Sequence, residues 1–422
     1  MIDSKTFITE PARQLPLGGA YDVIVAGGGP SGFAAALRAA REGCRVLLLE
    51  KNECLGGIWT SGLMPWIIDT PGKSGILVEL CNALTERGGY QARPNTFTAP
   101  PEELRHLLEK LCLESGVTIR YGTWAADAIT EKSVLKFVIT ESKSGREAWQ
   151  AKIFIDATGD GDLAARAGCA FDYGNESGIA QPASLTAILG GVDLEIKADF
   201  FVTGDGKKKL LAAMNSVGID PSYAHPSLFH YGCGIVGLMS HHAYGVDPLD
   251  ADSRTQAVLT GRAELHKQIN ALRTLPGWEK TVLLGTAANL GIREGRRIKG
   301  RACVTTELLH SDYPANTVCI PKFCIDIHSP DPSKCKSVVQ DRPQNRAAGY
   351  GIPFAAMVTQ DVENLLVTGR CISGDFYMHA SYRVTGNSVP LGEAAGFGAA
   401  QAVQKNIQLF DVDNVPCFSK QQ

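Results

Sequence analysis

The clearest hydrophobic pattern lies near the N-terminus and predicts a strand, a helix and a second strand. Residues 22–26 form a short apolar run in front of consecutive glycines, as expected for a buried parallel strand. In residues 33–40, apolar side chains recur at positions i, i+3, i+4 and i+7, which places them on one face of a helix. Residues 45–49 are a second apolar run. The pattern therefore predicts two parallel strands joined by a helix.

A glycine-rich loop connects the first predicted strand to the helix. Gly27, Gly29 and Gly32 have the spacing G-x-G-x-x-G. In dinucleotide-binding folds the first glycine allows a tight turn, the second lets the backbone approach a pyrophosphate, and the third lets the helix pack on the strand. Glu50 ends the second strand, where it can accept hydrogen bonds from ribose hydroxyls. Because strand, helix and acid are all in place, the sequence predicts a dinucleotide site rather than a glycine turn that merely packs tightly.

A second match to the glycine pattern, at residues 232–237, lacks that context. Asp252 follows at a suitable distance, but Gly245 and Pro248 interrupt the segment between. That segment is also too short for a helix and a strand. We therefore predict a backbone turn here, not a second nucleotide site.

The rest of the chain predicts a mixed architecture of two lobes. A sheet of parallel strands is extended by antiparallel strands, and a second lobe mixes helices and strands. Helices are expected at 75–87, 101–115 and 254–275, a parallel strand at 117–121, antiparallel strands within 124–155, and a short strand at 317–320.

Composition narrows the classes of protein. A chain of 422 residues is long enough for two lobes. The net charge of −3 argues against a broad nucleic-acid surface. The 12 cysteines are scattered without a CxxC, which favours reduced thiols in a cytoplasmic protein. No apolar run approaches the roughly 20 residues of a membrane span, so we expect neither a nucleic-acid nor a membrane partner.

Five further blocks bear on which dinucleotide is bound. Residues 51–57 continue past Glu50 into a Gly-Gly pair, and residues 58–63 extend this segment. Residues 153–162 contain Ala-Thr-Gly. Residues 364–370 end in Gly-Arg, and residues 392–396 are Gly-Glu-Ala-Ala-Gly in a stretch of small residues.

With these blocks the chain resembles the FAD-dependent oxidoreductases with a glutathione-reductase-like FAD fold, a broad group that includes relatives of the heterodisulfide reductase flavin subunit. Residues 290–300 and 379–384 resemble further signatures of that group. The likeness touches both ends and the middle of the chain. The sequence differs from those of the disulfide reductases, because Cys54 precedes the Gly-Gly pair and has no partner cysteine nearby. Thiol–disulfide chemistry is therefore not expected.

The resemblance implies a fold and a domain division. The fold class is α/β, with a Rossmann-like FAD-binding domain (a parallel sheet with a β-meander) plus a second, mixed α+β substrate domain. The FAD domain is expected at residues 1–170 and 361–422, with the substrate domain at 171–360 between them. Residues 392–396 are expected to open a helix whose N-terminus faces the pyrimidine edge of the flavin.

The resemblance also implies the groups that hold FAD, which come from the glycine loop, the Gly-Gly loop, the meander and the C-terminal blocks. The expected cofactor-binding residues are Gly27, Gly29, Pro30, Ser31, Gly32, Glu50, Lys51, Gly56, Gly57, Thr60, Ala126, Thr158, Gly159, Gly369, Arg370, Gly392, Ala394 and Ala395.

Three residues are candidates for the chemistry. The resemblance places residues 379–384 beside the flavin, where His379 could remove a substrate proton. Arg383 could hold a carboxylate or stabilise reduced flavin. Arg293 opens a basic stretch, residues 293–301, and on a strand it would share a face with Arg297, so either could lie at the lobe interface. For all three the alternative is a structural or solvated role.

Histidine pairs invite a metal interpretation that the spacing does not support. His241 and His242 are adjacent and would point apart on regular structure, and His225 and His230 have no carboxylate at ligand spacing. We therefore predict no metal.

The leading functional hypothesis is an FAD-dependent oxidoreductase that transfers a hydride between a small organic substrate and flavin N5. Its electron donor or acceptor is unspecified, and a homo-oligomer is compatible with the sequence. One alternative is a non-redox protein, in which FAD or NAD scaffolds partner binding or RNA modification. Another is an NAD-linked dehydrogenase, against which the Gly-Gly loop and the C-terminal blocks argue.

Overall fold

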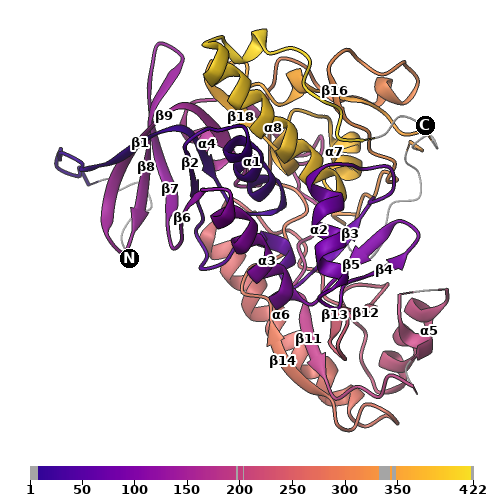
Figure 1. Cartoon of the computed structure of the whole chain (residues 1–422). Coiled ribbons are helices and arrows are strands. Elements are labelled where there is room, and N and C mark those ends of the chain that lie inside the picture. Colours follow the sequence, from indigo (N-terminus) through magenta and orange to yellow (C-terminus); the bar gives the residue numbers. More distant parts are fainter. Residues whose placement is uncertain (1–7, 196–197, 203, 332–342, 345–347, 420–422) are drawn as a thin grey trace.

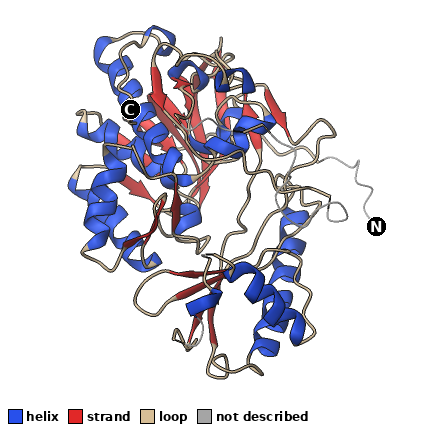
Figure 2. Cartoon of the chain, turned by 90° about the vertical axis from the view of Figure 1, so that its right-hand side faces the viewer, coloured by secondary structure: helices blue, strands red, loops and turns tan. Residues whose placement is uncertain are grey.

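The computed structural model describes residues 8–195, 198–202, 204–331, 343–344 and 348–419. The chain folds into two regions (Figures 1 and 2). The larger contains the main sheet with helices packed on it, and the smaller contains a second sheet beside a long helix. The N-terminal and C-terminal segments both belong to the larger region, and the middle of the chain forms the smaller one.

The main sheet has seven strands in the order β6-β2-β1-β9-β8-β7, and β18 pairs with β9. The pairs β1–β2, β2–β6, β1–β9 and β9–β18 are parallel, whereas β7–β8 and β8–β9 are antiparallel. The strands are β1 (Leu17–Ala26), β2 (Val46–Leu49), β6 (Thr118–Arg120), β7 (Trp124–Glu131), β8 (Val134–Ser142), β9 (Gly145–Asp156) and β18 (Leu365–Val367).

Strand β9 connects the meander to the parallel sheet. Its residues 145–150 pair with β8, and its residues 154–156 pair with β18 from the far end of the chain. The predicted antiparallel strands within 124–155 are confirmed. The last of them also pairs in parallel with β1, from Leu17 to Ala26. The apolar ends of these strands are buried on both faces, as parallel sheets require.

Helices α1 (Pro30–Arg41) and α8 (Thr385–Lys405) pack tightly against each other on this sheet, as Figure 1 shows. Small residues make this possible: a Cβ on Gly392 would lie 2.0 Å from the carbonyl oxygen of Ser31, and one on Gly396 would lie 2.3 Å from that of Ala35. Further helices of this region are α2 (Ile76–Thr85), α3 (Pro101–Glu114), α4 (Asp162–Arg166) and α7 (Phe376–Tyr382).

The start of α8 differs from the expectation. The helix begins at Thr385, after Val384, rather than at residues 392–396. Those residues lie in its interior, facing α1, because glycine and alanine are what the close helix contact admits. The N-terminus that points toward the glycine loop is therefore formed by Thr385 and its neighbours.

The smaller region is built on a four-stranded antiparallel sheet of order β12-β13-β11-β14. Helix α6 (Ala251–Leu272) covers it, and the Asp250 carboxylate caps the helix by accepting from the Ser253 amide at 2.7 Å. Helix α5 (Gly206–Ser216) also belongs here. The strands are β11 (Ala187–Gly190), β12 (Ser227–His230), β13 (Val236–Met239) and β14 (Val282–Thr286).

Short elements complete the described fold. The remaining strands are β3 (Trp66–Ile68), β4 (Tyr90–Arg93), β5 (Thr96–Thr98), β10 (Phe171–Tyr173), β15 (Arg296–Ile298), β16 (Thr317–Cys319) and β17 (Ile352–Pro353). The 3-10 turns are η1 (Gly57–Trp59), η2 (Ala198–Phe200), η3 (Thr306–Leu309), η4 (Phe354–Ala356), η5 (Gly369–Cys371) and η6 (Leu409–Asp411).

The described residues form three hydrophobic clusters, and the two larger ones are the cores of the two regions. The first includes residues from β1, β2, β9, α1 and α8, and also Ile298, Val318 and Phe354 from later in the chain. The second is formed by the four-stranded sheet with α5 and α6. The chain therefore returns to the first core soon after residue 290, well before β18.

The second glycine match is a turn, as predicted. Gly232 follows β12 with a φ of 93°, and the amide of Tyr231 donates to the carbonyl of Ile235 at 2.9 Å before β13 begins. The expected helices are confirmed to within a few residues at their ends, as are the strands near 117–121 and 317–320.

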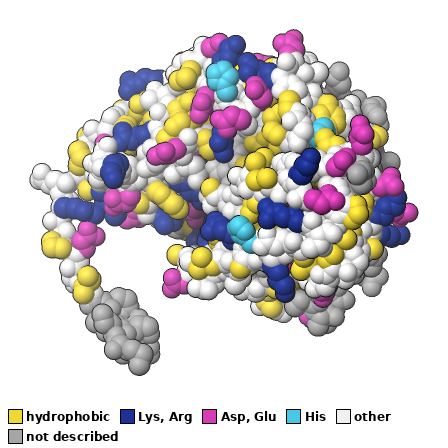
Figure 3. Space-filling view, turned by 90° about the horizontal axis from the view of Figure 1, so that it is seen from below, with side chains coloured by type: hydrophobic (Ala, Val, Ile, Leu, Met, Phe, Trp, Pro, Cys, Tyr) yellow, Lys and Arg dark blue, Asp and Glu magenta, His cyan; other side chains and the backbone are white. Residues whose placement is uncertain are grey.

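Basic and acidic side chains are intermixed on the face seen in Figure 3, with apolar side chains scattered among them. That face has no broad positively charged region of the kind that nucleic-acid binding requires. Within the described part of the chain, none of the helices combines the length and apolarity that crossing a bilayer requires.

Candidate functional site

A cavity of about 370 Å³ extends from the glycine loop of the main sheet to the second region. One end is lined by the loop after β1, the end of β2 and the loop after β9. The other end is lined by the segment before β15, by residues near 326 and by the start of α8. Cofactor sites of parallel α/β sheets lie at this position, outside the carboxyl ends of the strands.

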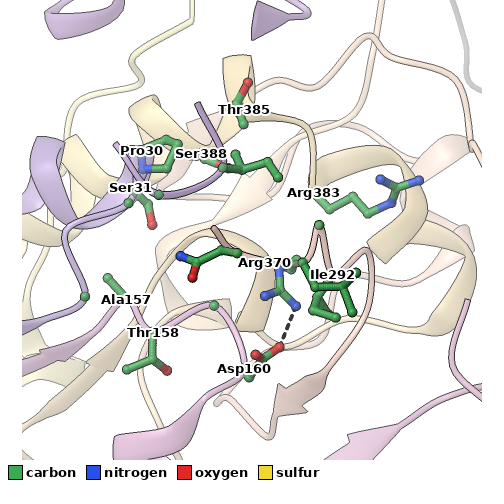
Figure 4. A pocket seen from close by; sticks show the side chains of 18 of the residues that line it. Pro30, Ser31, Ala157, Thr158, Asp160, Ile292, Arg370, Arg383, Thr385 and Ser388 are labelled. Carbon is green, nitrogen blue, oxygen red and sulfur yellow. Dashed lines mark hydrogen bonds and ion pairs between the residues drawn. The ribbon is translucent and has the colours of Figure 1, made fainter. Parts of the chain in front are cut away.

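The glycine loop leaves space where a ligand would approach. A Cβ on Gly29 would meet no atom within 4 Å, whereas one on Gly32 would lie 1.8 Å from the carbonyl oxygen of Gly27. Gly29 precedes α1 with no side-chain cap, and Pro30 occupies the first helical position. The amides of the first turn are therefore free to bind an anion such as a pyrophosphate. Pro30 and Ser31 lie side by side at the cavity wall in Figure 4.

Glu50 secures the loop from the end of β2. Its Oε2 accepts a hydrogen bond from the Gly28 amide at 2.6 Å, and its Oε1 accepts from the amide of Asn52 at 2.8 Å and from its Nδ2 at 2.6 Å. Glu50 is buried and still lines the cavity together with Lys51. Three of the four lone pairs of this carboxylate thus hold the loop, and the fourth can accept a hydrogen bond from a ribose.

The loop after β9 is organised by Asp156. Its Oδ1 accepts from the amide and the hydroxyl of Thr158, at 2.9 and 2.7 Å, and its Oδ2 accepts from the Ala164 amide at 2.8 Å. Burial raises the pKa of Asp156 to about 6, against these hydrogen bonds, which lower it. Thr158 and Gly159 are thereby fixed at the cavity wall.

Arg370, in the turn η5 that follows β18, contacts Asp160 at the cavity wall. Its Nη1 lies 2.7 Å from Asp160 Oδ1, the contact drawn as a dashed line in Figure 4. A Cβ on Gly159 would lie 2.8 Å from Arg370 Nη2, so the guanidinium also covers this glycine. Arg254 of α6 lies 3.8 Å from Asp160 Oδ2, which links the second region to the same carboxylate.

Ten of the expected cofactor-binding residues line the cavity, and eight do not. Those that line it are Gly27, Gly29, Pro30, Ser31, Glu50, Lys51, Gly57, Thr158, Gly159 and Arg370. Of the others, Gly32, Gly56 and Thr60 pack within the loops rather than facing the cavity. The hydroxyl of Thr60, for example, donates to the carbonyl of Leu55 at 2.5 Å. Ala126, Gly369, Gly392, Ala394 and Ala395 also lie outside the lining.

These five departures have clear physical reasons. Ala126 lies in β7 with its carbonyl accepting from Arg166, while its neighbour Ala125 lines the cavity. A Cβ on Gly369 would lie 2.5 Å from the hydroxyl of Ser31, so this residue packs behind the loop. Gly392, Ala394 and Ala395 are buried inside α8. The polar groups that α8 presents to the cavity are Thr385 and Ser388 instead.

Arg293, Arg383, Asp326 and His328 come together at the other end of the cavity. Nη2 of Arg383 donates to the carbonyl of Asp326 at 2.8 Å and lies 3.2 Å from its Oδ2. Nε2 of His328 lies 3.3 Å from the same Oδ2. In Figure 4, Arg383 and Ile292 lie on the side of the cavity away from Ala157 and Thr158.

Charge and burial set the protonation of this cluster. Burial lowers the pKa of His328 to about 4, and the Arg293 guanidinium adds to the effect. Burial alone would raise the pKa of Asp326, but His328, Arg383 and Arg293 hold it well below its ordinary value. At neutral pH the imidazole is therefore neutral and the carboxylate is ionised.

The basic side chains of residues 293–301 have different surroundings. Arg293 and Arg297 are both buried, but they do not share a strand, because β15 begins at Arg296, and only Arg293 lines the cavity. Arg297 pairs with Glu294 and donates to the carbonyls of Gly174 and Gly374. Lys299 reaches Asp172, and Arg301 is exposed.

His379 is not where the sequence placed it. It lies in α7, fully buried and outside the cavity lining, with its ring 5.5 Å from that of Tyr382. Burial, together with Arg297, Arg383 and Arg370, holds its pKa well below the ordinary value. One helical turn separates it from Arg383, and only Arg383 turns toward the cavity. The expectation that His379 removes a substrate proton is therefore withdrawn.

Sequence reasoning missed Asp326, His328, Thr385 and Ser388. One signal was present, because Asp326 and His328 alternate with apolar residues in 325–328, which would place both on one side of an extended chain. In the described part of the chain no three potential ligands are grouped to hold a metal ion. His242 instead accepts from the Arg293 guanidinium, with Nε2 and Nη2 3.1 Å apart.

The fold and the cavity define a class of protein, a two-lobed α/β protein that binds a dinucleotide at the carboxyl ends of its parallel strands. The chain belongs to the FAD-dependent oxidoreductase family, whose model matches residues 22–421. It is therefore an enzyme, and FAD is its cofactor. The open Gly29, the uncapped start of α1 and the carboxylate of Glu50 fit the adenosine diphosphate part of FAD.

Similar proteins carry several activities. A thiamine thiazole synthase from Methanococcus vannielii is 30% identical over 153 residues, covering 33% of this chain and 56% of that protein. Digeranylgeranylglycerophospholipid reductase 2 from Methanopyrus kandleri is 29% identical over 153 residues, covering 33% and 37%. The chain thus spans about half the length of these relatives or less. The solved structure of p-nitrophenol 4-monooxygenase PnpA from Pseudomonas putida aligns with a TM-score of 0.48 at 11% identity, over 92% of this chain and 81% of that one.

Proposed function

We propose that this enzyme transfers a hydride between a small organic substrate and N5 of its flavin. The observation that supports this most is the continuity of the cavity, which joins the dinucleotide loop to a group of charged side chains at its other end. Flavin supplies the hydride chemistry when bound, and the protein positions and polarises the reactants. The electron partner of the flavin is left open.

We propose that FAD contacts the ten predicted residues that line the cavity, from Gly27 to Arg370, together with Thr385 and Ser388. The start of α8 would supply amides and a partial positive charge where the reduced flavin carries negative charge. Gly32, Gly56, Thr60 and Gly392 would act indirectly, by letting the surrounding loops and helices pack.

Of the three predicted catalytic candidates, Arg383 and Arg293 line the cavity. Arg383 stands directly before α8, next to the proposed flavin edge, and its Asp326 partner limits its freedom. We propose that Arg383 stabilises negative charge on the flavin or substrate, because a guanidinium keeps its charge even when buried.

We propose two domains, an FAD domain formed by both ends of the chain and a substrate domain between them. The predicted bounds were 1–170, 171–360 and 361–422. The two hydrophobic cores support a division near residue 170. The packing of Ile298, Val318 and Phe354 into the first core favours an earlier return than residue 361.

Purification with bound FAD followed by anaerobic reduction tests the proposal. A panel of small organic donors and nicotinamides is mixed with the protein while the flavin absorbance is recorded. We expect at least one donor to bleach the flavin within seconds. A flavin that exchanges no electrons with any donor or acceptor would contradict hydride transfer. Protein that stays colourless with added FAD would contradict the proposed site itself.

A further inference from the structure

Arg293 is a buried cation that forms no salt bridge among the described residues, although the carboxylate of Asp326 acts on it from a greater distance. Its Nη1 donates to the carbonyl of Pro182 at 2.6 Å and lies 2.9 Å from the hydroxyl of Ser184. Its Nη2 lies 3.1 Å from Nε2 of His242. All three acceptors are neutral, since burial and the Arg293 charge hold the pKa of His242 well below its ordinary value. A buried guanidinium that is hydrogen-bonded only to neutral groups recovers little of the free energy that it lost on leaving water.

The surrounding charges do not cancel that of Arg293. Asp326 is shared between Arg383 and His328, and Glu294 is paired with Arg297. The neighbouring rings of Tyr223 and His242 are neutral at pH 7. Three guanidiniums therefore face two carboxylates, and one positive charge is left over. Burial and the charge of Arg383 lower the pKa of Arg293 to about 10, which still leaves it charged at neutral pH.

Arg293 also has hydrogen-bonding capacity to spare. Three of its five N–H groups are used by Pro182, Ser184 and His242. Arg293 and Ser184 both line the cavity, so the unused N–H groups on Nε and Nη2 are available to a ligand there. A carboxylate is the group that a guanidinium binds best through two N–H groups.

A second polar atom at this end has no partner. Nδ1 of His328 is buried without a hydrogen bond in the described structure, while Nε2 faces Asp326. Because Asp326 is ionised, Nε2 carries the hydrogen and Nδ1 is left as an acceptor. A ligand that satisfies Nδ1 must therefore donate a hydrogen bond, and it must displace a neighbouring side chain to do so, because Nδ1 has almost no accessible surface in the described structure.

Part of the cavity wall is apolar. Its lining includes the side chains of Met64, Trp66, Ile68, Met239 and Ile292. These side chains favour a ligand with a hydrocarbon body. A ligand ammonium group would be disfavoured, because Arg293 and Arg383 already place positive charge here.

We propose that this end of the cavity binds a hydroxycarboxylic acid, with its carboxylate on Arg293, its hydroxyl donating to Nδ1 of His328, and its hydrocarbon body against Met64, Trp66 and Met239. The inference rests on the proposed function and narrows its substrate class. His328 and Arg293 contact the ligand, whereas Asp326 acts as a positioning residue by fixing the imidazole.

Calorimetric titration of the FAD-loaded protein, with its flavin reduced beforehand under anaerobic conditions, tests the proposal without turnover, because a reduced flavin cannot accept hydride from the hydroxy acid. The probes are 2-hydroxy-4-methylpentanoate, its amide, 4-methylpentanoate and leucine. We expect the hydroxy acid to bind at least about tenfold more tightly than each of the other three, since each removes one charged or hydrogen-bonded contact or adds a like charge. Equal affinity for the acid and its amide, or no binding by any probe, would overturn the proposal.

Two variants assign the contacts. Arg293→Met should weaken binding of the hydroxy acid on the order of a hundredfold and abolish the preference for acid over amide. His328→Ala should abolish only the preference for the hydroxy acid over 4-methylpentanoate. Arg262→Met is the matched control, because Arg262 donates to Thr286 in the second region, away from the cavity. If either variant keeps the wild-type preferences, its assigned contact is wrong. The probe comparison on the wild-type protein remains decisive if a variant does not fold.

The binding test separates this inference from the proposed function. A protein that binds the hydroxy acid as described but whose flavin exchanges no electrons would contradict hydride transfer and leave the subsite standing. A protein whose flavin is reduced by other donors, and which shows no preference for the hydroxy acid, would contradict the subsite alone.

Discussion

The carboxylate of Glu50 accepts a hydrogen bond from the amide of Gly28 at 2.6 Å, so the acid at the end of β2 holds the glycine loop that precedes α1. Its other oxygen accepts two hydrogen bonds from Asn52. Glu50 is thus a structural residue of the loop before any ribose is bound. We therefore expect loop geometry and cofactor affinity to be coupled through this one side chain.

Glu50→Gln should weaken FAD binding by at least about tenfold, because the Gln amide would direct N–H groups at the Gly28 or Asn52 amides and leave one of them unpaired. Glu53→Gln, at an exposed position nearby, is the control and should bind FAD normally. Titration of apoprotein with FAD, followed by flavin fluorescence, measures both. Equal affinities would show that Glu50 holds neither the loop nor the ribose.

Gly29 and Gly32 should respond differently to added side chains. A Cβ at Gly29 would meet no protein atom within 4 Å, so Gly29→Val should fold normally and fail to load FAD. A Cβ at Gly32 lies 1.8 Å from the Gly27 carbonyl, so Gly32→Ala should unfold at a lower temperature even without FAD. Melting temperatures of the two apoproteins and their flavin content distinguish these outcomes. A Gly29→Val protein that retains FAD would contradict the assignment of the loop.

Asp156→Asn should destabilise the apoprotein by about 1–3 kcal/mol, because the amide can accept at only one of its two terminal atoms and three donors converge on Asp156. The loop with Thr158 and Gly159 should loosen, so FAD affinity should fall as well. Urea unfolding of the apoprotein gives the first effect and FAD titration the second. Thr130→Ala, in the exposed part of β7, should change neither.

His328 should make stability depend on pH between 4 and 6.5. In the folded protein its pKa is about 4, whereas an unfolded histidine has a pKa near 6.5. Unfolding in this range therefore takes up a proton, and the contribution of His328 to stability falls as the pH falls, by on the order of 3 kcal/mol in total. Asp156 acts in the opposite direction, because its folded pKa is raised and its contribution falls as the pH rises from 4 to 6.

A comparison of variants isolates the histidine. The free energy of unfolding is measured for the wild-type protein and for His328→Gln at each pH from 4 to 7. The wild-type protein should lose stability relative to the variant as the pH falls, since Asp156 contributes equally to both. A constant difference across this range would contradict the lowered pKa of His328.

His379→Ala should reduce stability rather than change the chemistry directly. The ring is fully buried against Tyr382 and outside the cavity, so its removal leaves a void that costs roughly 3 kcal/mol. FAD should still bind, and the rate of flavin reduction should stay within about threefold of wild type below the melting temperature. A stable variant whose reduction is abolished would restore the catalytic role that the sequence suggested.

The sequence by itself determined the dinucleotide half of this protein. The strand at 22–26, the glycine spacing and Glu50 form one continuous segment, and each residue type answers a local requirement: apolar burial, room for backbone, or an acceptor at a strand end. The likeness to FAD-dependent oxidoreductases rested on blocks of the same local kind, and the family match agrees with it. Local steric and hydrogen-bonding requirements determine the residue types of such segments, so these segments can be recognised without a tertiary structure.

Only the tertiary structure decided the other end of the cavity. Arg293, His328 and Arg383 lie far apart in the chain, and only the packing of the folded chain brings them to one end of the cavity. The sequence alone could not show which side of α7 faces the cavity, so His379 was a candidate by resemblance and His328 was missed. It also could not tell that residues 392–396 pack against α1, since small residues suit a helix interior as well as a helix start. Side-chain orientation across an interface depends on how the lobes pack, and that information is spread over the whole chain.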